Sequence, residues 1–179
     1  MKSNLTLIAL NPEFKKNIAK KLAEVLEMFY VDINEFIKYD IIDVNTVIKT
    51  AGLEYYNKLE TKAVSTISSY ENTLSTLTLS TFFSNDNFKI LKETSVFIYI
   101  RLKHSDFKAE LLKERPKSAK YENLLNEKVF YERDAVLKSL CDIVIDINFR
   151  EKNLTNKIIK SIKKYYKDVL WKVAKLSII

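Results

Sequence analysis

The sequence predicts an α/β fold in which a parallel sheet is covered by helices on both faces. Short apolar runs that indicate strands alternate with longer amphipathic patterns that indicate helices along the 179 residues. The predicted strands are nearly continuous in apolar residues, as expected for strands buried on both sides. The chain is 47% hydrophobic, and its length suits one core, so we expect a single domain.

The predicted elements follow in order from the N-terminus. A strand at residues 5–10 precedes a helix that begins at Asn11-Pro12-Glu13, because Asn caps helices and Pro favours the first helical position. A second strand at 29–32 leads into helical segments that include 44–50 and 53–68. Alternation of Thr and Leu makes 75–80 β-like. The remaining predicted elements are a helix at 87–92, a strand at 95–101, a helix at 105–114, a break at 115–118, a helix at 122–140, a strand at 142–147 and a long amphipathic helix at 155–176.

Composition excludes several classes of protein. The chain has one glycine, where an average usage of about 7% would give about a dozen, so a mechanism with a glycine-rich loop is nearly excluded. A single cysteine, Cys141, excludes an intramolecular disulfide. We expect no leader sequence, because no charged-then-apolar run with a small-residue cleavage site opens the chain, and no apolar run reaches the roughly 18 residues of a membrane span. We expect a cytoplasmic protein with no transmembrane segment. His104, the only histidine, predicts a turn residue and no metal site.

The net charge of +7 is concentrated in the last thirty residues. From Arg150 onward there are nine Lys/Arg and two acidic residues, so the rest of the chain is neutral. We therefore expect no nucleic-acid partner for the body of the protein. The tail is either a longer helix with a solvated lysine face that packs on its own core, or a binding surface for a partner protein or an anionic membrane. The residues that would make the anionic contact are Lys163, Lys164, Lys167, Trp171 and Lys172.

Several strings, in their order and spacing, resemble the shikimate kinase family from Asn4 to about Ile162. They are NLTLI (4–8), KKLA (20–23), YVDIN (30–34), GLEYYNKLE (52–60), YERD (131–134) and CDIVID (141–146). The resemblance implies a three-layer α/β/α sandwich around a five-stranded parallel sheet, of the P-loop kinase type. It also implies ATP-dependent phosphorylation of shikimate in aromatic amino acid biosynthesis. It places the domain at residues 1–168, a lid region at about 105–120, and a C-terminal helical extension at 169–179.

The stretch equivalent to the family's phosphate loop, G-x-x-x-x-G-K-[ST], departs from that pattern. In such a loop the glycines let backbone N–H groups surround the phosphates, the lysine contacts the β/γ oxygens, and the hydroxyl binds Mg²⁺. Only Lys15 matches. Ala9 and Phe14 stand where glycines belong, Pro12 has no N–H, and Lys16 replaces the hydroxyl.

The substituted residues form an ordinary helix start. We expect the first helix to begin near Pro12, with Asn11 capping the amides that a nucleotide would otherwise satisfy. Glu13 adds a negative charge where phosphates would lie. Phe14 or its neighbours would fill the former phosphate space.

Two substrate-binding positions of the family are also changed. The second Asp of the family's Asp-x-Asp, which contacts a shikimate hydroxyl, is Asn34, and the Arg that grips the substrate carboxylate is Asn57. Losing that Arg removes a charge-assisted pair worth roughly 2–3 kcal/mol. A Gly-Gly-Gly segment is replaced by bulkier residues at 80–82.

The charged residues in matching positions allow two interpretations each. Lys15 and Lys16 could form a residual anion site at a helix N-terminus, but the missing glycines favour two solvated lysines. Asp32 either holds Mg²⁺ through water, as the resemblance implies, or caps a helix. Arg115 and Arg133 either close on a phosphorylated ligand or form surface ion pairs.

The leading hypothesis from the sequence is a catalytically inactive pseudokinase that binds no nucleotide cofactor. It would serve binding, regulation or assembly, with a protein partner or as a homodimer. The alternative is a weak or atypical phosphotransferase that holds Mg-ATP without glycines, using Lys15, Lys16, Arg115 and Arg133.

Overall fold

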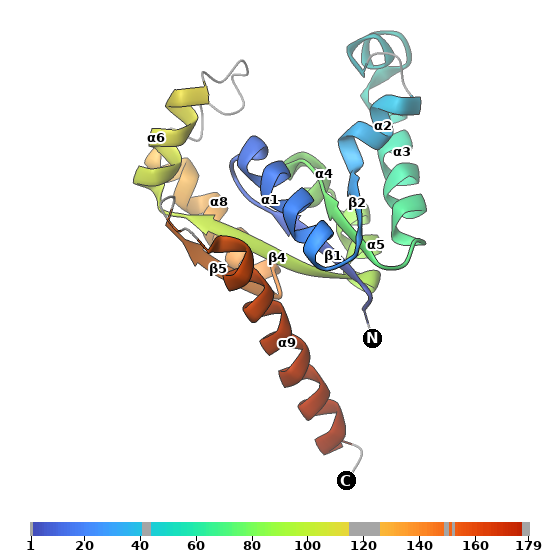
Figure 1. Cartoon of the computed structure of the whole chain (residues 1–179). Helices are drawn as coiled ribbons and strands as arrows, with labels where there is room; N and C mark the ends of the chain where they lie inside the picture. Colours follow the sequence, from blue (N-terminus) through green and yellow to red (C-terminus); the bar gives the residue numbers. More distant parts are fainter. Residues whose placement is uncertain (1, 41–43, 115–125, 149–150, 152, 177–179) are drawn as a thin grey trace. The chain divides into compact units, whose positions relative to one another are not determined.

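A computed structural model describes residues 2–40, 44–114, 126–148, 151 and 153–176 (Figure 1). The chain divides into two compact units, Met1–Ile98 and Tyr99–Ile179. The division falls inside strand β4 (Ser95–Leu102). The predicted boundary at residue 168 falls inside one continuous helix, α9 (Leu154–Leu176), and the arrangement as one domain with an extension stays a prediction.

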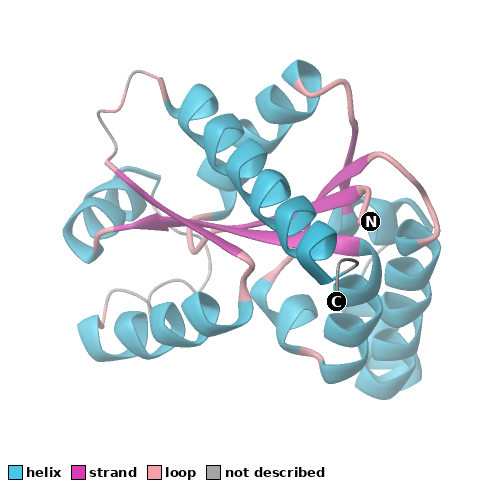
Figure 2. Cartoon of the chain, turned by 90° about the horizontal axis from the view of Figure 1, so that it is seen from below, coloured by secondary structure: helices cyan, strands magenta, loops and turns pink. Residues whose placement is uncertain are grey.

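The first unit alternates strands with helices. Before β4 its elements are β1 (Asn4–Ile8), α1 (Pro12–Val25), β2 (Phe29–Asp32), α2 (Ile33–Asp40), α3 (Val44–Ser68), β3 (Thr73–Thr76), α4 (Leu79–Phe83) and α5 (Asn85–Thr94). Helix α1 packs against β1, β2 and β3, while α3 packs against α2 and α5. Figure 2 distinguishes the helices, in cyan, from the strands, in magenta.

The strands form one five-stranded parallel sheet in the order β2-β3-β1-β4-β5. Leu74 of β3 is paired with Leu5 of β1 on one side and with Tyr30 of β2 on the other. The predicted fold class, a three-layer α/β/α sandwich around this sheet, is confirmed. In such sheets ligands bind at the carboxyl ends of the strands. The segments after β1, β2 and β3 reach that edge together.

The core of the first unit is built from the strands and from one face of each helix. All five residues of β1 are buried. Phe82 of α4 is fully buried, with its ring edge-on to Phe88 at 5.5 Å and to Phe97 at 5.3 Å between centroids. Edge-on aromatic pairs add to the stabilisation from buried area. These aromatic rings therefore fix α4 and α5 to β4 within the unit.

In the first unit one predicted strand is shorter in the structure, and two predicted helices are confirmed as separate segments. The β-like pattern at 75–80 is a strand only to Thr76, because Thr78 caps α4 by accepting a hydrogen bond from the Thr81 N–H at 3.1 Å. The two predicted helices at 44–50 and 53–68 are the parts of α3 on either side of Gly52. Gly52 has φ +86°, a conformation that disfavours other residues, so the chain's one glycine marks the break in the helix.

The second unit contains the rest of β4, α6 (His104–Glu114), α8 (Glu127–Leu140), β5 (Ile143–Ile147) and α9. Its strand β5 is not buried on both faces as predicted: Ile143, Ile145 and Ile147 are buried, and the two residues between them are exposed. This alternation is typical of a strand with one solvated face. Helix α9 packs on β5. His104 begins α6 instead of forming a turn, and its ring lies 4.9 Å from that of Phe130.

Candidate functional site

The candidate site lies in the first unit, at the carboxyl edge of β1, β2 and β3. Helix α1 begins after β1, Asp32 ends β2, and Leu77 follows β3 directly. The sequence places Ala9, Pro12, Phe14, Lys15 and Lys16 in the segment that would form a phosphate loop. The backbone of this segment enters the helix at Pro12 without a wide loop.

The start of α1 is closed by its own side chains. Asn11 is the N-cap and is fully buried, and its Oδ1 accepts a hydrogen bond from the Phe14 N–H at 2.8 Å. Pro12 occupies the first helical position and has no N–H to offer. Ala9, which replaces the first glycine, is buried. The predicted helix start at Asn11 and Pro12 is confirmed.

Lys15 is buried instead of solvated. Its side chain is 7% exposed, and its Nζ donates a hydrogen bond to the main-chain carbonyl of Leu77, just beyond β3. Burial lowers the pKa of Lys15 to about 8, while the negative charge of Asp32 acts in the opposite direction. The interpretation as a solvated lysine is therefore wrong for Lys15. Phe14, which was expected to fill the phosphate space with its neighbours, remains half-exposed.

Lys16 and Asp32, at the same edge of the sheet, also bind other groups of the chain. Lys16 forms an ion pair with Glu35 of α2, which raises the pKa of Lys16 and lowers that of Glu35. Asp32 Oδ1 accepts hydrogen bonds from the N–H groups of Asn34 at 3.0 Å and Glu35 at 3.3 Å. Asp32 therefore caps α2, as one of the two sequence interpretations predicted.

The chemistry available at this edge is limited by these internal contacts. The two lysines that could bind an anion hold a carbonyl and a carboxylate of the chain itself. The hydroxyl that would ligate Mg²⁺ is replaced by the Lys16 ammonium, which repels cations. Within the described residues, no group of three His, Cys, Asp or Glu side chains is arranged to hold a metal ion.

The two substituted shikimate-contact residues differ in how far they are buried. Asn34 is half-buried in the first turn of α2, and Asn57 is exposed on α3. Sequence reasoning missed a nearby buried carboxylate, Glu60 of α3, which is 7% exposed. Its oxygens accept hydrogen bonds from Thr81 Oγ1 at 2.8 Å and Asn87 Nδ2 at 3.2 Å. The sequence contains this Glu at the end of the GLEYYNKLE string. Its burial could not be predicted, because its hydrogen-bond partners lie 21 and 27 residues away.

The residues that replace the family's glycine segment have a structural role. Thr81 and Phe82 lie in α4 and are fully buried, and Thr81 joins the Glu60 contact. Ser80 is exposed on the same short helix. The added bulk therefore fills the core of the first unit.

In the second unit, Arg133 does not join the main charged cluster of the described residues. Arg115 lies outside the described residues, and Arg133 is half-buried on α8 with no ion-pair partner among the described side chains. Its neighbour Asp134 is 3% exposed and was missed. Arg101 Nε donates to both oxygens of Asp134, at 2.8 and 2.9 Å, and the Tyr99 hydroxyl donates to Oδ1 at 2.9 Å.

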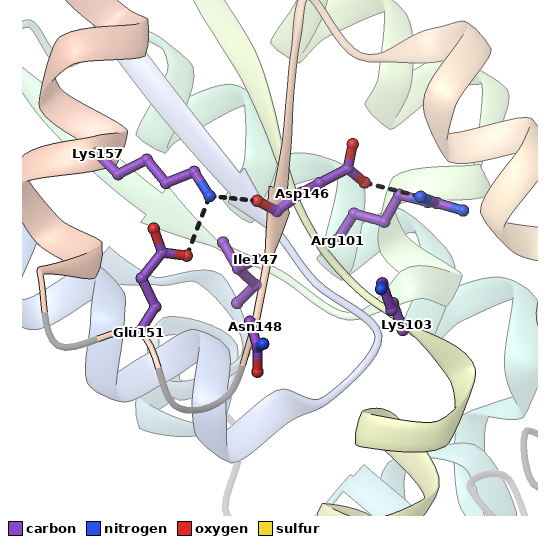
Figure 3. A pocket seen from close by; sticks show the side chains of 7 residues that line it. All are labelled: Arg101, Lys103, Asp146, Ile147, Asn148, Glu151 and Lys157. Carbon is purple, nitrogen blue, oxygen red and sulfur yellow. Dashed lines mark hydrogen bonds and ion pairs between the residues drawn. The ribbon is translucent and has the colours of Figure 1, made fainter.

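A pocket of about 380 Å³ opens beside this cluster, after the ends of β4 and β5 (Figure 3). Arg101 Nη1 donates to Asp146 Oδ1 at 2.7 Å. Lys157 Nζ donates to the Asp146 carbonyl at 2.7 Å and to Glu151 at 3.0 Å. Lys103 also lines the pocket and is exposed. The pocket is therefore bounded by charged side chains that are mostly paired with one another.

The comparisons with known proteins decide the family. The shikimate kinase family model matches residues 14–163. The chain belongs to the shikimate kinase family. The match begins at Phe14, so Ala9 and Pro12 of the phosphate-loop position lie outside it. Among curated proteins, no sequence gives a significant match.

Solved structures share the fold of this shikimate kinase family member. Shikimate kinase from Acinetobacter baumannii, in complex with shikimate, is 18% identical, with a TM-score of 0.71 over 92% of this chain and 94% of that one. The enzyme from Bacteroides thetaiotaomicron is 12% identical, with a TM-score of 0.73 over 92% and 98%. A gluconokinase from Sinorhizobium meliloti is 7% identical, with a TM-score of 0.60 over 96% and 97%. At these identities the likeness establishes the fold alone.

The structure also bears on membrane association. In the part of the chain that it describes, no helix is both long enough and apolar enough to span a bilayer.

Proposed function

We propose that this member of the shikimate kinase family is a pseudokinase, which has kept the fold for a binding role in regulation or assembly and does not transfer phosphoryl groups. The observation that carries the proposal is the position of Lys15. Its ammonium is buried and donates to the Leu77 carbonyl, so the one retained lysine of the phosphate loop serves as an internal tether.

The helix start supports the same proposal. A phosphate bound at a helix N-terminus is held by free backbone N–H groups. Here Asn11 already accepts the hydrogen bond of the Phe14 N–H, and Pro12 provides none. The family match begins at Phe14, so it omits Asn11 and Pro12. A nucleotide would have to displace these contacts before its phosphates could be held.

The loss of the Mg²⁺ ligand supports it further. Lys16 stands in place of the hydroxyl and is paired with Glu35, and Asp32 is used as the cap of α2. A Mg-ATP complex bound here would bring its metal ion toward an ammonium group. Asn57 has no charge to offer a substrate carboxylate.

The test is ligand binding and phosphotransfer by the full chain. Thermal unfolding is measured with Mg-ATP, with shikimate and with both, and an active shikimate kinase serves as the positive control. A ligand at 100 times its dissociation constant would stabilise the protein by about 2.7 kcal/mol. We expect no shift of the unfolding temperature up to about 10 mM ligand, a concentration at which the control enzyme is saturated. We also expect no ADP release in a coupled assay.

The opposite result supports the atypical phosphotransferase. A shift with Mg-ATP that disappears in Lys15→Met, together with shikimate-dependent ADP release, would overturn the pseudokinase proposal. Lys62→Met is the matched control, because Lys62 is an exposed lysine of α3 in the same unit. A shift that survives Lys15→Met would place the nucleotide elsewhere, and the phosphate-loop position would still be inactive.

We also propose that α9 contacts an anionic membrane surface. The support for this proposal is that Lys163, Lys164 and Lys167 are exposed on α9 and so are open to such a surface. The helix continues without a break to Leu176, past the end of the family match at residue 163. A basic amphipathic helix binds such surfaces through buried apolar area and attraction to acidic lipids.

A further inference from the structure

A polar pocket lies in the first unit at the amino ends of the strands, away from the edge that carries Lys15. Its volume is about 430 Å³. It is bounded by the residues before and at the start of β1, by the end of α3 with the turn that follows, and by the end of α5. Its lining includes Asn4, Ser68, Tyr70, Glu71, Glu93 and Thr94.

The frame of the pocket is fixed by hydrogen bonds. Asn4 is 2% exposed, and its Nδ2 donates to the Tyr70 carbonyl at 2.7 Å while its Oδ1 accepts from the Thr73 N–H at 3.0 Å. The Ser69 hydroxyl donates to the Thr66 carbonyl at 2.7 Å. The turn between α3 and β3 is therefore tied to both the helix and β1, and the pocket is preformed.

Two hydroxyl groups of the lining have no hydrogen-bond partner in the part of the chain that the structure describes. Ser68 is 9% exposed, and its Oγ is buried with no hydrogen-bond partner among the described residues. The Oγ1 of Thr94, at the end of α5, is also buried and has no hydrogen-bond partner among the described residues. A buried polar group left unpaired costs about 1–3 kcal/mol. Two such groups in one pocket point to a ligand that supplies hydrogen bonds.

The charge of the pocket defines that ligand. Helices α3 and α5 both end here, and a helix C-terminus carries roughly half a negative charge. Glu71 and Glu93 add two exposed carboxylates, against one cation, Lys2. The exposed ring of Tyr70 can stack on a cation. A metal ion is disfavoured, because the described residues contain no cluster of three metal-ligating side chains.

We propose that this pocket binds a small organic cation with primary ammonium groups, of the aliphatic diamine class. An ammonium group has three N–H donors. The hydroxyl oxygens of Ser68 and Thr94 accept from it, and Glu71 and Glu93 neutralise its charge. The proposal is independent of the phosphate-loop position and holds whether or not the protein transfers phosphoryl groups.

The test compares a diamine with a neutral molecule of the same length. Binding of 1,4-diaminobutane and of 1,4-butanediol to the full chain is followed by amide chemical shifts at constant ionic strength. We expect saturable shifts of residues 68–71 and 93–95 with the diamine and none with the diol. Glu71→Gln combined with Glu93→Gln should weaken binding at least 10-fold, and Ser68→Ala should weaken it several-fold.

A matched control separates the pocket from the general charge of the protein. Glu24→Gln with Glu54→Gln removes two exposed carboxylates of the first unit that lie outside the pocket. We expect these changes to leave the diamine affinity unchanged. Equal losses in both double variants, equal binding of the diol, or no saturable shift at 20 mM diamine, about the limit of specific weak binding, would each overturn the proposal. The exposed glutamates can be changed without disturbing the core, so a folding defect does not obscure the result.

Discussion

The Lys15 ammonium donates a hydrogen bond to the main-chain carbonyl of Leu77, a residue 62 positions further along the chain. The contact joins the first turn of α1 to the end of β3, across the edge where a P-loop kinase would hold phosphate. Burial of this ammonium lowers its pKa to about 8 from 10.5. The charged lysine is therefore held in the folded protein at a cost, and that cost depends on pH.

Lys15→Met tests this cost. Because the folded pKa lies below the unfolded one, the unfolded chain binds more protons between about pH 8 and pH 10.5, and stability rises with pH across that window. The full shift corresponds to about 3 kcal/mol. We expect the free energy of unfolding in urea, as wild type minus Lys15→Met, to rise by that order between pH 7 and pH 10.5.

Lys16→Met is the control for this experiment. Lys16 is exposed in part and its pKa is raised by Glu35, so its contribution to stability is present at neutral pH and is lost only above pH 10.5. The wild type minus Lys16→Met difference should not rise between pH 7 and pH 10.5. A flat profile for Lys15→Met would show that the ammonium is solvated.

Asp32→Asn should move to lower pH the range in which the stability difference between wild type and Lys15→Met rises. The carboxylate of Asp32 raises the pKa of Lys15 against the effect of burial, so its neutralisation lowers that pKa further. Asn caps helices about as well as Asp, so α2 should keep its start. The unfolding free energy of Asp32→Asn, minus that of the double variant with Lys15→Met, is measured against pH. The pH at which this difference has risen by half is then compared with the wild-type value. An unchanged midpoint would contradict the proximity of the two side chains.

Asn11→Ala tests the closed helix start. The substitution removes the acceptor of the Phe14 N–H and should lower the unfolding free energy by about 1 kcal/mol. Asn17→Ala is the control, because Asn17 is exposed in the middle of α1, where alanine is the better helix former. Urea midpoints measured at constant m-value give both numbers. A loss in Asn17→Ala as large as that in Asn11→Ala would reject the cap.

The helix start at Pro12 was predictable because its signals are local. Asn11 and Pro12 are adjacent and the apolar spacing follows them within the same helix, and the structure uses them as the sequence indicates. The strand at 95–101 and the helix at 155–176 were found within one or two residues for the same reason, since a long periodic or apolar run sets its own element.

The burial of Lys15 was not predictable, because it depends on a carbonyl 62 residues away. The same holds for Glu60, whose partners Thr81 and Asn87 lie on α4 and α5. At 75–80 two local signals competed: the alternation of Thr and Leu favoured a strand, and the cap at Thr78 favoured a helix. The cap prevailed because the aromatic core around Phe82 requires α4.

Asp134→Ala should strongly destabilise the protein. Asp134 is buried and accepts hydrogen bonds from Arg101 and Tyr99, and removing one partner of such an ion pair costs roughly 3–5 kcal/mol. Asp146 pairs with the same arginine, but its side chain is 76% exposed. Asp146→Ala should therefore cost less than about 1 kcal/mol. Chemical denaturation compares the two, and equal losses would contradict the burial of the Arg101–Asp134 pair.

The basic face of α9 gives the last prediction. Trp171 is the only tryptophan, so its fluorescence reports on α9 alone. With vesicles that contain phosphatidylserine we expect a blue shift of its emission, and with neutral phosphatidylcholine vesicles none. Each lysine near an anionic surface contributes about 1 kcal/mol, so changing Lys163, Lys164 and Lys167 to Glu should weaken binding by at least about 100-fold.

The control for α9 makes the same charge change in the first unit, at the exposed residues Lys38, Lys49 and Lys62. If attraction were due only to the net charge of +7, both triple variants would lose binding equally, and the role of α9 would be rejected. Because attraction to a charged surface falls off within about 8 Å at physiological salt, only lysines next to the bilayer contribute strongly. We therefore expect the triple variant on α9 to lose the blue shift of Trp171 and the triple variant in the first unit to keep it.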